Sequence, residues 1–385
     1  MKVRHHFFAL IMALLLTACS SGLSNATPEP TIFVPIIGGG EATSLANGTD
    51  VPATELAPAE WVNLGLAGRL QYTLGKDGIR QLDLATGETR DVFVPVANTW
   101  LTSAATSPDG SQLAVAYAPP PPTGVAQLGY TGIYVLPGDC AERDGGCTVD
   151  DLEGLVTQVD PHEAYFSPTW SADGQTLYFA HFTPSQGDSN TPFKYTLERK
   201  SLPDGQPEIL VENAIWPALS ADGSQIAYVW FDPEDYSNDL FIASADGSNQ
   251  RVLVDPTLFE AVDAPFFSAD SKYVIFSAVG DGTGVPPSTP ASAGWLDRLL
   301  GARTAYAAPE AHNVPSDWWR VPVAGGAPER LSQIFDTGLY GDAGPNDEWF
   351  TFISASGLYV MPPDGGDVTR LARVAGGGTV EWLSP

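Results

Sequence analysis

The sequence predicts an all-β protein, a six-bladed β-propeller with four-stranded blades, and three observations lead to that fold class. A four-residue turn pattern recurs along the chain, each copy directly before an apolar strand. The clear copies stand roughly 50 residues or more apart, which is enough for one blade of four strands. The chain also ends at residues 380–385 on a strand pattern that no further blade follows.

The turn reads Ser-Pro-Asp-Gly in its fullest copy, and Ser-Ala-Asp-Gly or Ser-Ala-Asp-Ser elsewhere. Ser can cap the backbone, Pro presets φ at the second position, and Asp and Gly tolerate the third and fourth positions. Such turns are typical corners of β-hairpins. The clear copies begin at Ser107, Ser171, Ser220 and Ser268.

Weaker copies complete the count of blades. Residues 67–68 and 344–347 each precede an apolar strand, which brings the strand sets to six. The strand at 380–385 would then complete the first blade, whose N-terminal part supplies only three strands. This closure would pair the two ends of the folded chain and remove the open sheet edges of the ring. A seven-bladed ring or a β-sandwich is the competing fold.

The repeat resembles the TolB-like propeller repeat of bacterial cell envelopes, a relative of the WD-type repeats. The resemblance covers residues 61–385 and is carried by the turns and the strands after them. Residues 107–110 match the family corner fully, the Ser-Ala-Asp copies depart from it at the Pro, and the first and sixth blades match mainly by position.

The N-terminus has the layout of a secretory signal in residues 1–18. Lys2 and Arg4 precede an apolar run that is too short to remain as a membrane span. The Leu-Thr-Ala-Cys sequence that ends at Cys19 resembles a lipoprotein signal, and this resemblance implies that Cys19 becomes the lipidated first residue. An ordinary signal peptide with an incidental Cys is the alternative. We expect a protein exported to the extracytoplasmic space, such as the periplasm, and held at the cell membrane or outer membrane by the lipid alone.

Residues 19–60 are rich in Ser, Thr, Pro, Gly and Ala, which predicts a flexible tether between the anchor and a ring that begins at residue 61. The alternative is that residues 32–37 add a strand to the ring.

The composition is strongly acidic, with 18 Lys and Arg against 46 Asp and Glu and a net charge of −28. Nucleic acid and anionic lipid surfaces are therefore poor partners. A basic protein, a cationic ligand or a divalent metal suits the charge better, and solubility alone would also explain it.

Two cysteines remain besides Cys19, in an Asp- and Gly-rich segment. An oxidising compartment would favour a local disulfide between Cys140 and Cys147, which would pin one loop. Two free thiols, or a metal site, are the alternatives.

Connections of unequal length predict which face of the ring binds a partner. Connections between the first and second strands, and between the third and fourth, are mostly tight turns, whereas long loops gather on the opposite face. Residues just ahead of the Ser turns should surround the mouth of the ring on that face. There they could bind a peptide or sugar, or simply pack. They are Trp100, Thr102, His162, Tyr165, Trp216, Asp263, Tyr340, Asp342 and Glu381.

An insertion at 280–316 in the fifth blade holds apolar residues at roughly helical spacing, which predicts a short amphipathic helix. It could cover the mouth, dock a partner, touch the membrane interface or pack on the rim. The residues of this candidate docking helix are Trp295, Leu296, Leu299, Leu300 and Arg303.

Familiar catalytic motifs are absent from the sequence, which has no Gly-x-Ser-x-Gly elbow, no phosphate-binding Gly loop and no His-Glu-x-x-His. Calcium is an alternative, as in propellers that hydrolyse lactones or esters, because carboxylates supply hard oxygen ligands. Its candidate ligands are Asp263, Asp342 and Glu381, or Asp232, Glu234, Asp235 and Asp239.

The function expected from the sequence is a non-catalytic binding scaffold without a cofactor, a monomeric ring that binds an envelope protein. A receptor for a soluble peptide or sugar, and a calcium-dependent lactonase or esterase-like hydrolase, are the alternatives.

Overall fold

The computed structural model describes residues 53–121, 130–184, 193–232, 237–284 and 314–384. The chain divides into two compact units, Met1–Pro35 and Ile36–Pro385, and every described residue belongs to the second. The predicted lipoprotein signal with Cys19, the tether up to residue 52 and the candidate docking helix lie outside the described residues. Within the described ranges no helix is long and apolar enough to cross a membrane.

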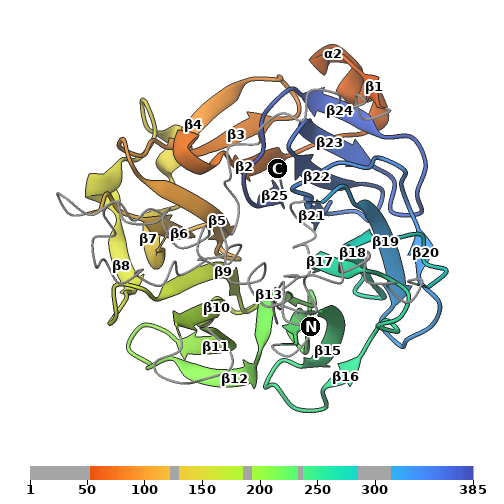
Figure 1. Ribbon diagram of the computed structural model, residues 1–385. Coiled ribbons are helices and arrows are strands. Elements are labelled where there is room, and N and C mark those ends of the chain that lie inside the picture. Colours follow the sequence, from red (N-terminus) through yellow and green to blue (C-terminus); the bar gives the residue numbers. More distant parts are fainter. Residues whose placement is uncertain (1–52, 122–129, 185–192, 233–236, 285–313, 385) are drawn as a thin grey trace, which may run out of the picture. The chain divides into compact units, whose positions relative to one another are not determined.

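Six β-sheets surround one axis in the second unit (Figure 1), which confirms the predicted six-bladed propeller with four-stranded blades. The four strands of each blade are antiparallel and follow one another outward from the axis. The innermost strands are β25 (Val380–Leu383), β5 (Trp100–Thr106), β9 (Ala164–Trp170), β13 (Ala214–Leu219), β17 (Ala261–Phe267) and β21 (Tyr340–Ala343).

Three further strands complete each blade. In blades 1 to 3 they are β2 (Arg69–Thr73), β3 (Ile79–Asp83) and β4 (Thr89–Phe93); β6 (Gln112–Ala118), β7 (Gly132–Pro137) and β8 (Glu153–Val156); and β10 (Thr176–Pro184), β11 (Phe193–Ser201) and β12 (Glu208–Glu212). In blades 4 to 6 they are β14 (Gln225–Phe231), β15 (Asn238–Ser244) and β16 (Arg251–Val252); β18 (Tyr273–Val279), β19 (Asp317–Pro322) and β20 (Glu329–Arg330); and β22 (Phe350–Ser354), β23 (Gly357–Met361) and β24 (Thr369–Ala372). The short helix η2 (Gly75–Asp77) connects β2 to β3.

The C-terminal strand closes the ring, as the sequence predicts. β25 pairs antiparallel with β2, with Leu70 opposite Trp382 and Tyr72 opposite Val380. Gly68, just before β2, has φ +91°, and a Cβ atom there would lie 2.3 Å from the carbonyl oxygen of Leu383. Glycine permits this approach because any side chain would collide with the closing strand.

The recurring Ser-x-Asp turns are closed by the same kind of hydrogen bonds in each copy. In the first, the Ser107 hydroxyl donates to Asp109 Oδ1 at 2.7 Å, and the Ser111 amide donates to the same oxygen at 3.0 Å. The polar groups of these turns are therefore largely satisfied within the turn. The carboxylates that accept in the same way in the other copies are Asp173, Asp222 and Asp270.

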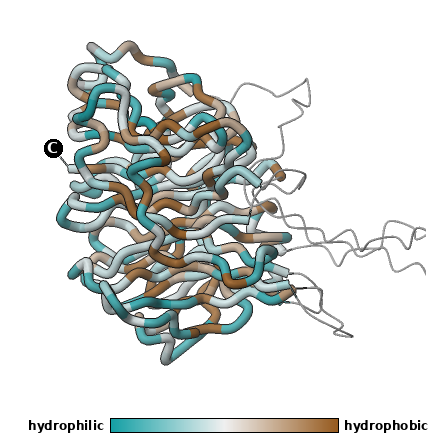
Figure 2. Tube along the Cα trace, turned by 90° about the vertical axis from the view of Figure 1, so that its left-hand side faces the viewer, coloured by the Kyte–Doolittle hydropathy of each residue, from teal (hydrophilic) through white to brown (hydrophobic). Residues whose placement is uncertain are grey.

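Hydrogen bonds also show that both hairpin turns of a blade lie on one face, named here the turn face. The Gly138 amide donates to Ser111 O in blade 2, and the Leu202 amide donates to Gln175 O in blade 3. The opposite face, named the loop face, carries the connections from second to third strand and from one blade to the next. In Figure 2 the C-terminal end of the chain, after β25, marks the turn face.

Three innermost strands carry the same irregularity. Ser167, Trp216 and Ala264 have positive φ values of 50°, 49° and 44°, and each precedes a proline. The pairing with the second strand shifts register at each of these places. Such bulges bend a strand and increase its local twist, which helps the innermost strands to converge on the axis.

Apolar side chains fill the spaces between blades. The largest cluster joins blades 3, 4 and 5, with Phe166, Trp216 and Phe276 among its buried members. Another joins blades 6 and 1 around Trp61 and Trp382. Figure 2 shows hydrophobic residues throughout the interior of the stacked sheets. Burial between neighbouring blades therefore holds the ring together.

The folded unit begins earlier than the residue 61 expected from the sequence. β1 (Thr54–Glu55) pairs in parallel with β24 and adds a fifth strand to blade 6. The short helices α2 (Pro58–Trp61) and η1 (Val62–Leu64) follow, and Trp61 is buried. The prediction of a flexible tether is therefore wrong for residues 54–60, because strand pairing and the burial of Trp61 hold that stretch against the ring.

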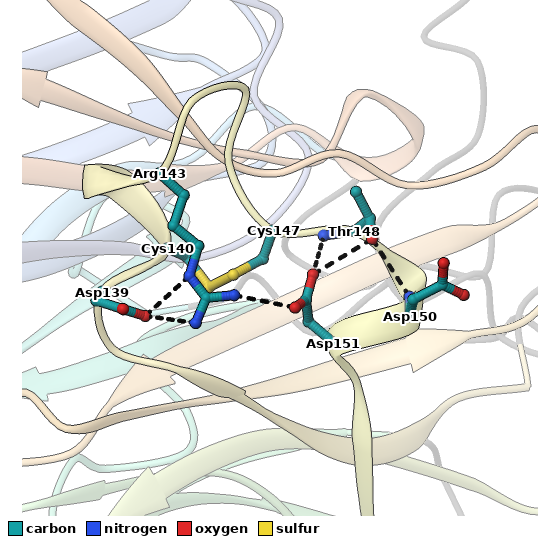
Figure 3. A network of polar contacts seen from close by, with 7 residues as sticks. All are labelled: Asp139, Cys140, Arg143, Cys147, Thr148, Asp150 and Asp151. Atoms are coloured by element: carbon teal, nitrogen blue, oxygen red, sulfur yellow. Dashed lines mark hydrogen bonds and ion pairs between the residues drawn. A yellow bond between two sulfur atoms is a disulfide. The ribbon is translucent and has the colours of Figure 1, made fainter.

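Cys140 and Cys147 form a disulfide in the connection from β7 to β8, which also contains the short helices η3 (Cys140–Glu142) and η4 (Val149–Asp151). Figure 3 shows Arg143 beside the disulfide. Its guanidinium lies 2.8 Å from Asp139 and 2.9 Å from Asp151.

The same segment reaches the neighbouring blade. The Cys147 amide donates to Val92 O, and the Cys147 carbonyl accepts from the Val94 amide. The disulfide loop therefore joins blade 2 to the outermost strand of blade 1.

Candidate functional site

Two carboxylates on neighbouring innermost strands, Asp342 on β21 and Glu381 on β25, lie at the seam where the ring closes. Asp342 accepts hydrogen bonds from the amides of Trp382 at 2.8 Å and Ala343 at 3.0 Å. Glu381 accepts from the Thr106 amide at 2.8 Å, the Thr106 hydroxyl at 2.7 Å and Gln71 Nε2 at 3.2 Å. The two acids therefore connect blade 6 to blade 1 and blade 1 to blade 2.

Burial shifts the pKa values of both acids upward. Desolvation raises the pKa of Asp342 to about 6 and that of Glu381 to about 7, and the nearby Asp342 charge adds to the second shift. Each residue keeps some accessible surface, but protein surrounds the carboxylates closely enough for desolvation to outweigh their hydrogen bonds. Both groups therefore change charge near neutral pH.

The aromatic residues expected to present an open binding surface are packed instead. Tyr165, Trp216 and Tyr340 are buried between blades. The Trp100 ring lies against η2, where a Cβ atom on Gly75 would be 3.0 Å from Trp100 Cζ2. The prediction of an aromatic binding surface is wrong for Tyr165, Trp216 and Tyr340, whereas Trp100 keeps part of its surface exposed. Large rings fill the interior between neighbouring sheets, which is packed as densely as other protein cores.

Two polar residues predicted for the same surface are buried as well. The Thr102 hydroxyl lies 3.4 Å from that of Ser103. Asp263 has no exposed surface, and its Oδ1 accepts a hydrogen bond from the Ala264 amide at 2.8 Å, beside the bulge of β17.

A polar cluster that the sequence did not predict lies inside blade 3. His181 Nδ1 is 2.8 Å from Glu198 Oε1, and the Thr196 hydroxyl donates to the same oxygen. The Tyr165 ring stacks on the imidazole with ring centres 4.1 Å apart. The side chains of His181 and Glu198 are only 13% and 8% exposed, so this pair is largely removed from water.

One signal in the sequence could have located this cluster. Side chains alternate between the two faces of a strand, so His181 continues the face of β10 that carries Leu177 and Phe179. A histidine that follows two buried apolar positions on one face is itself expected to be buried and to need a polar partner.

His162 lies on the loop face, in the connection that precedes β9. Its Nδ1 is 3.0 Å from Asp160 Oδ1, and its ring meets the Tyr130 ring edge to face at 5.7 Å between centres. Its side chain is 35% exposed, so among the residues predicted for the mouth it remains open to contact from outside.

The two most exposed large apolar side chains of the described ranges lie on the loop face. Val159 is 93% exposed and Phe335 59%, each in a connection between blades. Val94 and Val96 are also exposed, but they follow β4, where the Val94 amide donates to Cys147 O of the disulfide loop. In the described ranges the Ser-x-Asp turns carry no large exposed apolar side chain. The remaining large exposed apolar side chains of those ranges are on outermost strands, and they are Ile209 and Val252.

The candidate calcium ligands do not form a metal site in the part of the chain that the structure describes, where no group of three or more His, Cys, Asp or Glu residues could hold a metal ion. The carboxylates of Asp342 and Glu381 accept hydrogen bonds from amides instead. Asp232 and Asp239 are described, whereas Glu234 and Asp235 lie outside the described residues.

Comparisons with known proteins give their clearest result for the fold. TolB from Acinetobacter baumannii superposes with a TM-score of 0.53 at 12% identity, over 83% of this chain and 67% of that one. A protein assigned as TolB from Agrobacterium tumefaciens gives 0.50 at 17% identity, over 81% and 90% of the two chains. The ring has the TolB propeller fold. At these identities the likeness concerns the fold alone, and a structure of a nidogen/laminin complex matches to a similar degree, with a TM-score of 0.50 at 11% identity over 82% and 98%.

Sequence comparison with curated proteins gives a match to part of this chain. Dipeptidyl-peptidase 5 of Porphyromonas gingivalis is 27% identical over 152 residues, which is 33% of this chain and 21% of that protein. The match therefore spans about a fifth of the length of the relative. No family model matches the chain.

Proposed function

We propose that this TolB-like ring is a non-catalytic scaffold that binds another protein of the cell envelope through its loop face. The observation that carries the proposal is the position of the exposed apolar side chains. Val159 and Phe335 project from connections between blades on that face. Apolar side chains that are left open to water on one side of a rigid scaffold are typical of protein-binding surfaces.

The Ser-x-Asp turns of the turn face offer a partner few free polar groups. These turns direct their carboxylates and hydroxyls toward their own backbone, as Asp109 and Asp222 do with their neighbouring serines. Groups that are already hydrogen-bonded within a turn gain little from a new partner. The contrast between the two faces favours binding on the loop face.

The proposed cellular location rests on the N-terminal sequence. Lys2 and Arg4, the short apolar run and Cys19 favour export and lipid anchoring, so that the ring, as a monomer, would face the extracytoplasmic space. The net charge of −28 favours a partner with a basic surface over nucleic acid.

Crosslinking in cells tests this proposal. A photoreactive phenylalanine analogue replaces Val159 or Phe335 on the loop face, and Ala172 or Ala221, at exposed positions of the turn face, serves as the matched control. We expect the two loop-face positions to capture the same envelope protein and the turn-face positions not to. Equal capture from both faces, or capture of unrelated proteins at the two loop-face positions, would contradict the proposal. A Cys19→Ser strain shows whether capture depends on the anchor.

A further inference from the structure

Another segment of the chain occupies the outer edge of blade 6, where it pairs with β24 as a parallel strand. Thr54 pairs with Thr369 and Glu55 with Arg370 in a parallel register, and the Thr54 amide donates to Val368 O at 2.9 Å. The strand β1 is only two residues long, and both its side chains are exposed. This pairing shows that the outer edge of blade 6 can bind an extended strand.

Two arginines hold the carboxylate of this strand. Arg370 and Arg373 each donate to the same oxygen of Glu55, both at 2.9 Å. The side chain of Arg370 is only 6% exposed, so its position is fixed by the blade, whereas that of Arg373 is 59% exposed. The hydrogen bond from Arg370 is the main cause that lowers the pKa of Glu55. The outer edge of blade 6 therefore binds both the backbone of an extended strand and the carboxylate of its side chain.

A groove of about 400 Å³ adjoins this edge. It is lined by Arg330, the last residue of β20, by the residues after it up to Ile334, and by residues that precede β24, among them Val368. Ala53 packs against the apolar cluster that contains Ile334 and Val368. A peptide that continued the register of β1 by two or three residues toward its N-terminus would run past Val368 and Asp367 into this groove.

Few interactions hold the resident strand. It is paired over two residues, and the Glu55 carboxylate that both arginines hold is 53% exposed, so each contact contributes only weakly to stability. The next segment is held much more firmly, because Trp61 is buried and its Nε1 donates to Leu56 O at 3.1 Å. Residues 53–55 can therefore lift from the edge while α2 stays in place.

We propose that this edge is a second binding site, which accepts an extended segment of a partner protein carrying a carboxylate, and that Thr54–Glu55 occupies it until such a segment displaces it. Strand addition at a sheet edge supplies backbone hydrogen bonds, and the side-chain contacts supply specificity. Charge favours an acidic segment here: Arg370 and Arg373 both lie at this edge of a protein with 46 acidic and only 18 basic residues. The site is on the rim of blade 6, and its groove adjoins the connection from blade 5 to blade 6 that contains Phe335.

Peptide binding to the full chain tests this proposal. The probe is a fluorescein-labelled peptide, Asp-Val-Pro-Ala-Thr-Glu-Leu-Ala, which matches residues 50–57. A Thr54→Pro, Glu55→Gln variant weakens the resident strand, because proline has no amide hydrogen for Val368 O and glutamine has no charge. We expect at least tenfold tighter binding to this variant than to the unaltered chain, where the resident strand competes at a high effective concentration.

Two controls assign the binding to this edge. Changing the glutamate of the peptide to glutamine, or Arg373→Gln in the variant, should each weaken binding about threefold to tenfold. Binding that ignores both changes, or no gain in a variant whose thermal unfolding is unaltered, overturns the proposal. A doubled mass in light scattering when the strand is weakened would assign the edge to residues 53–55 of a second copy and would overturn the partner protein as its occupant.

Discussion

The Glu381 carboxylate on the closing strand accepts hydrogen bonds from both the amide and the hydroxyl of Thr106 on the innermost strand of the next blade. The two residues are 275 positions apart in the chain. This contact ties the C-terminal strand to blade 2, in addition to its pairing with β2 in blade 1. Closure of the ring therefore depends in part on an acid whose charge changes near neutral pH.

Stability should fall as the pH rises through neutrality. The pKa of Glu381 in the folded protein is raised from 4.5 to about 7, so the stabilising contribution is complete below about pH 4.5 and is lost as the pH rises through 7. The raised pKa of Asp342, about 6, acts in the same direction. We expect the free energy of unfolding to drop by on the order of 2 kcal/mol between about pH 5 and about pH 8.5, measured by urea denaturation.

Replacing Glu381 tests whether this acid causes the pH dependence of stability. Glu381→Gln should remove most of it and leave the smaller part that is due to Asp342, whereas Glu88→Gln, at an exposed position of the turn face, should leave the profile unchanged. Parallel profiles for the unaltered protein and Glu381→Gln would show that this acid does not govern the closure.

Gly68→Ala should destabilise the ring more than a comparable glycine substitution elsewhere. Both Gly68 and Gly110 have positive φ, but a Cβ atom on Gly68 would meet Leu383 O at 2.3 Å, whereas nothing lies within 4 Å of one on Gly110. We expect a loss of about 3 kcal/mol for Gly68→Ala and about 1 kcal/mol for Gly110→Ala, from chemical denaturation. Similar losses at both sites would mean that the backbone conformation alone, and not contact with β25, sets the cost.

Removing the disulfide should loosen the junction between blades 1 and 2 without unfolding the ring. The combined Cys140→Ser and Cys147→Ser substitutions should cost about 2 kcal/mol. Hydrogen exchange should become faster at the amides of Val94 and Cys147, which pair the loop with the end of β4. Thr148→Ala, which removes the cap of η4 but keeps the disulfide, is the control. Unchanged exchange at Val94 would contradict a role in joining the blades.

The buried pair of His181 and Glu198 in blade 3 should contribute more to stability than an exposed ion pair in the same blade. Glu198→Ala leaves His181 and Thr196 without their buried acceptor and should cost about 3 kcal/mol. Glu212→Ala removes a partner of Lys194 that is 66% exposed and should change stability by about 0.5 kcal/mol or less. Thermal unfolding of the two variants makes the comparison, and equal shifts would count against a structural role for the buried pair.

Features with a short sequence signature could be predicted from the chain. The turns that begin at Ser107 and Ser171 need only local residues, because their hydrogen bonds form within five positions. The strand pattern at residues 380–383 also predicted its own partner. The first blade had only three strands in its N-terminal part, so the C-terminal strand was expected to pair with it. Features that depend on neighbouring blades were missed. Trp216 and Tyr340 are at the predicted positions but are buried, and no local pattern distinguishes an aromatic side chain that packs between sheets from one that faces a ligand.

The sequence by itself determined the repeat, the number of blades and the closure, because turn chemistry and strand alternation are encoded within a few neighbouring residues. Only the tertiary structure decided that Asp342 and Glu381 share the closing seam, that His181 meets Glu198, and that Thr54–Glu55 occupies the edge of blade 6. These relationships join residues on different strands or blades. Their energies come from desolvation and from hydrogen bonds that exist only once the sheets are arranged around the axis.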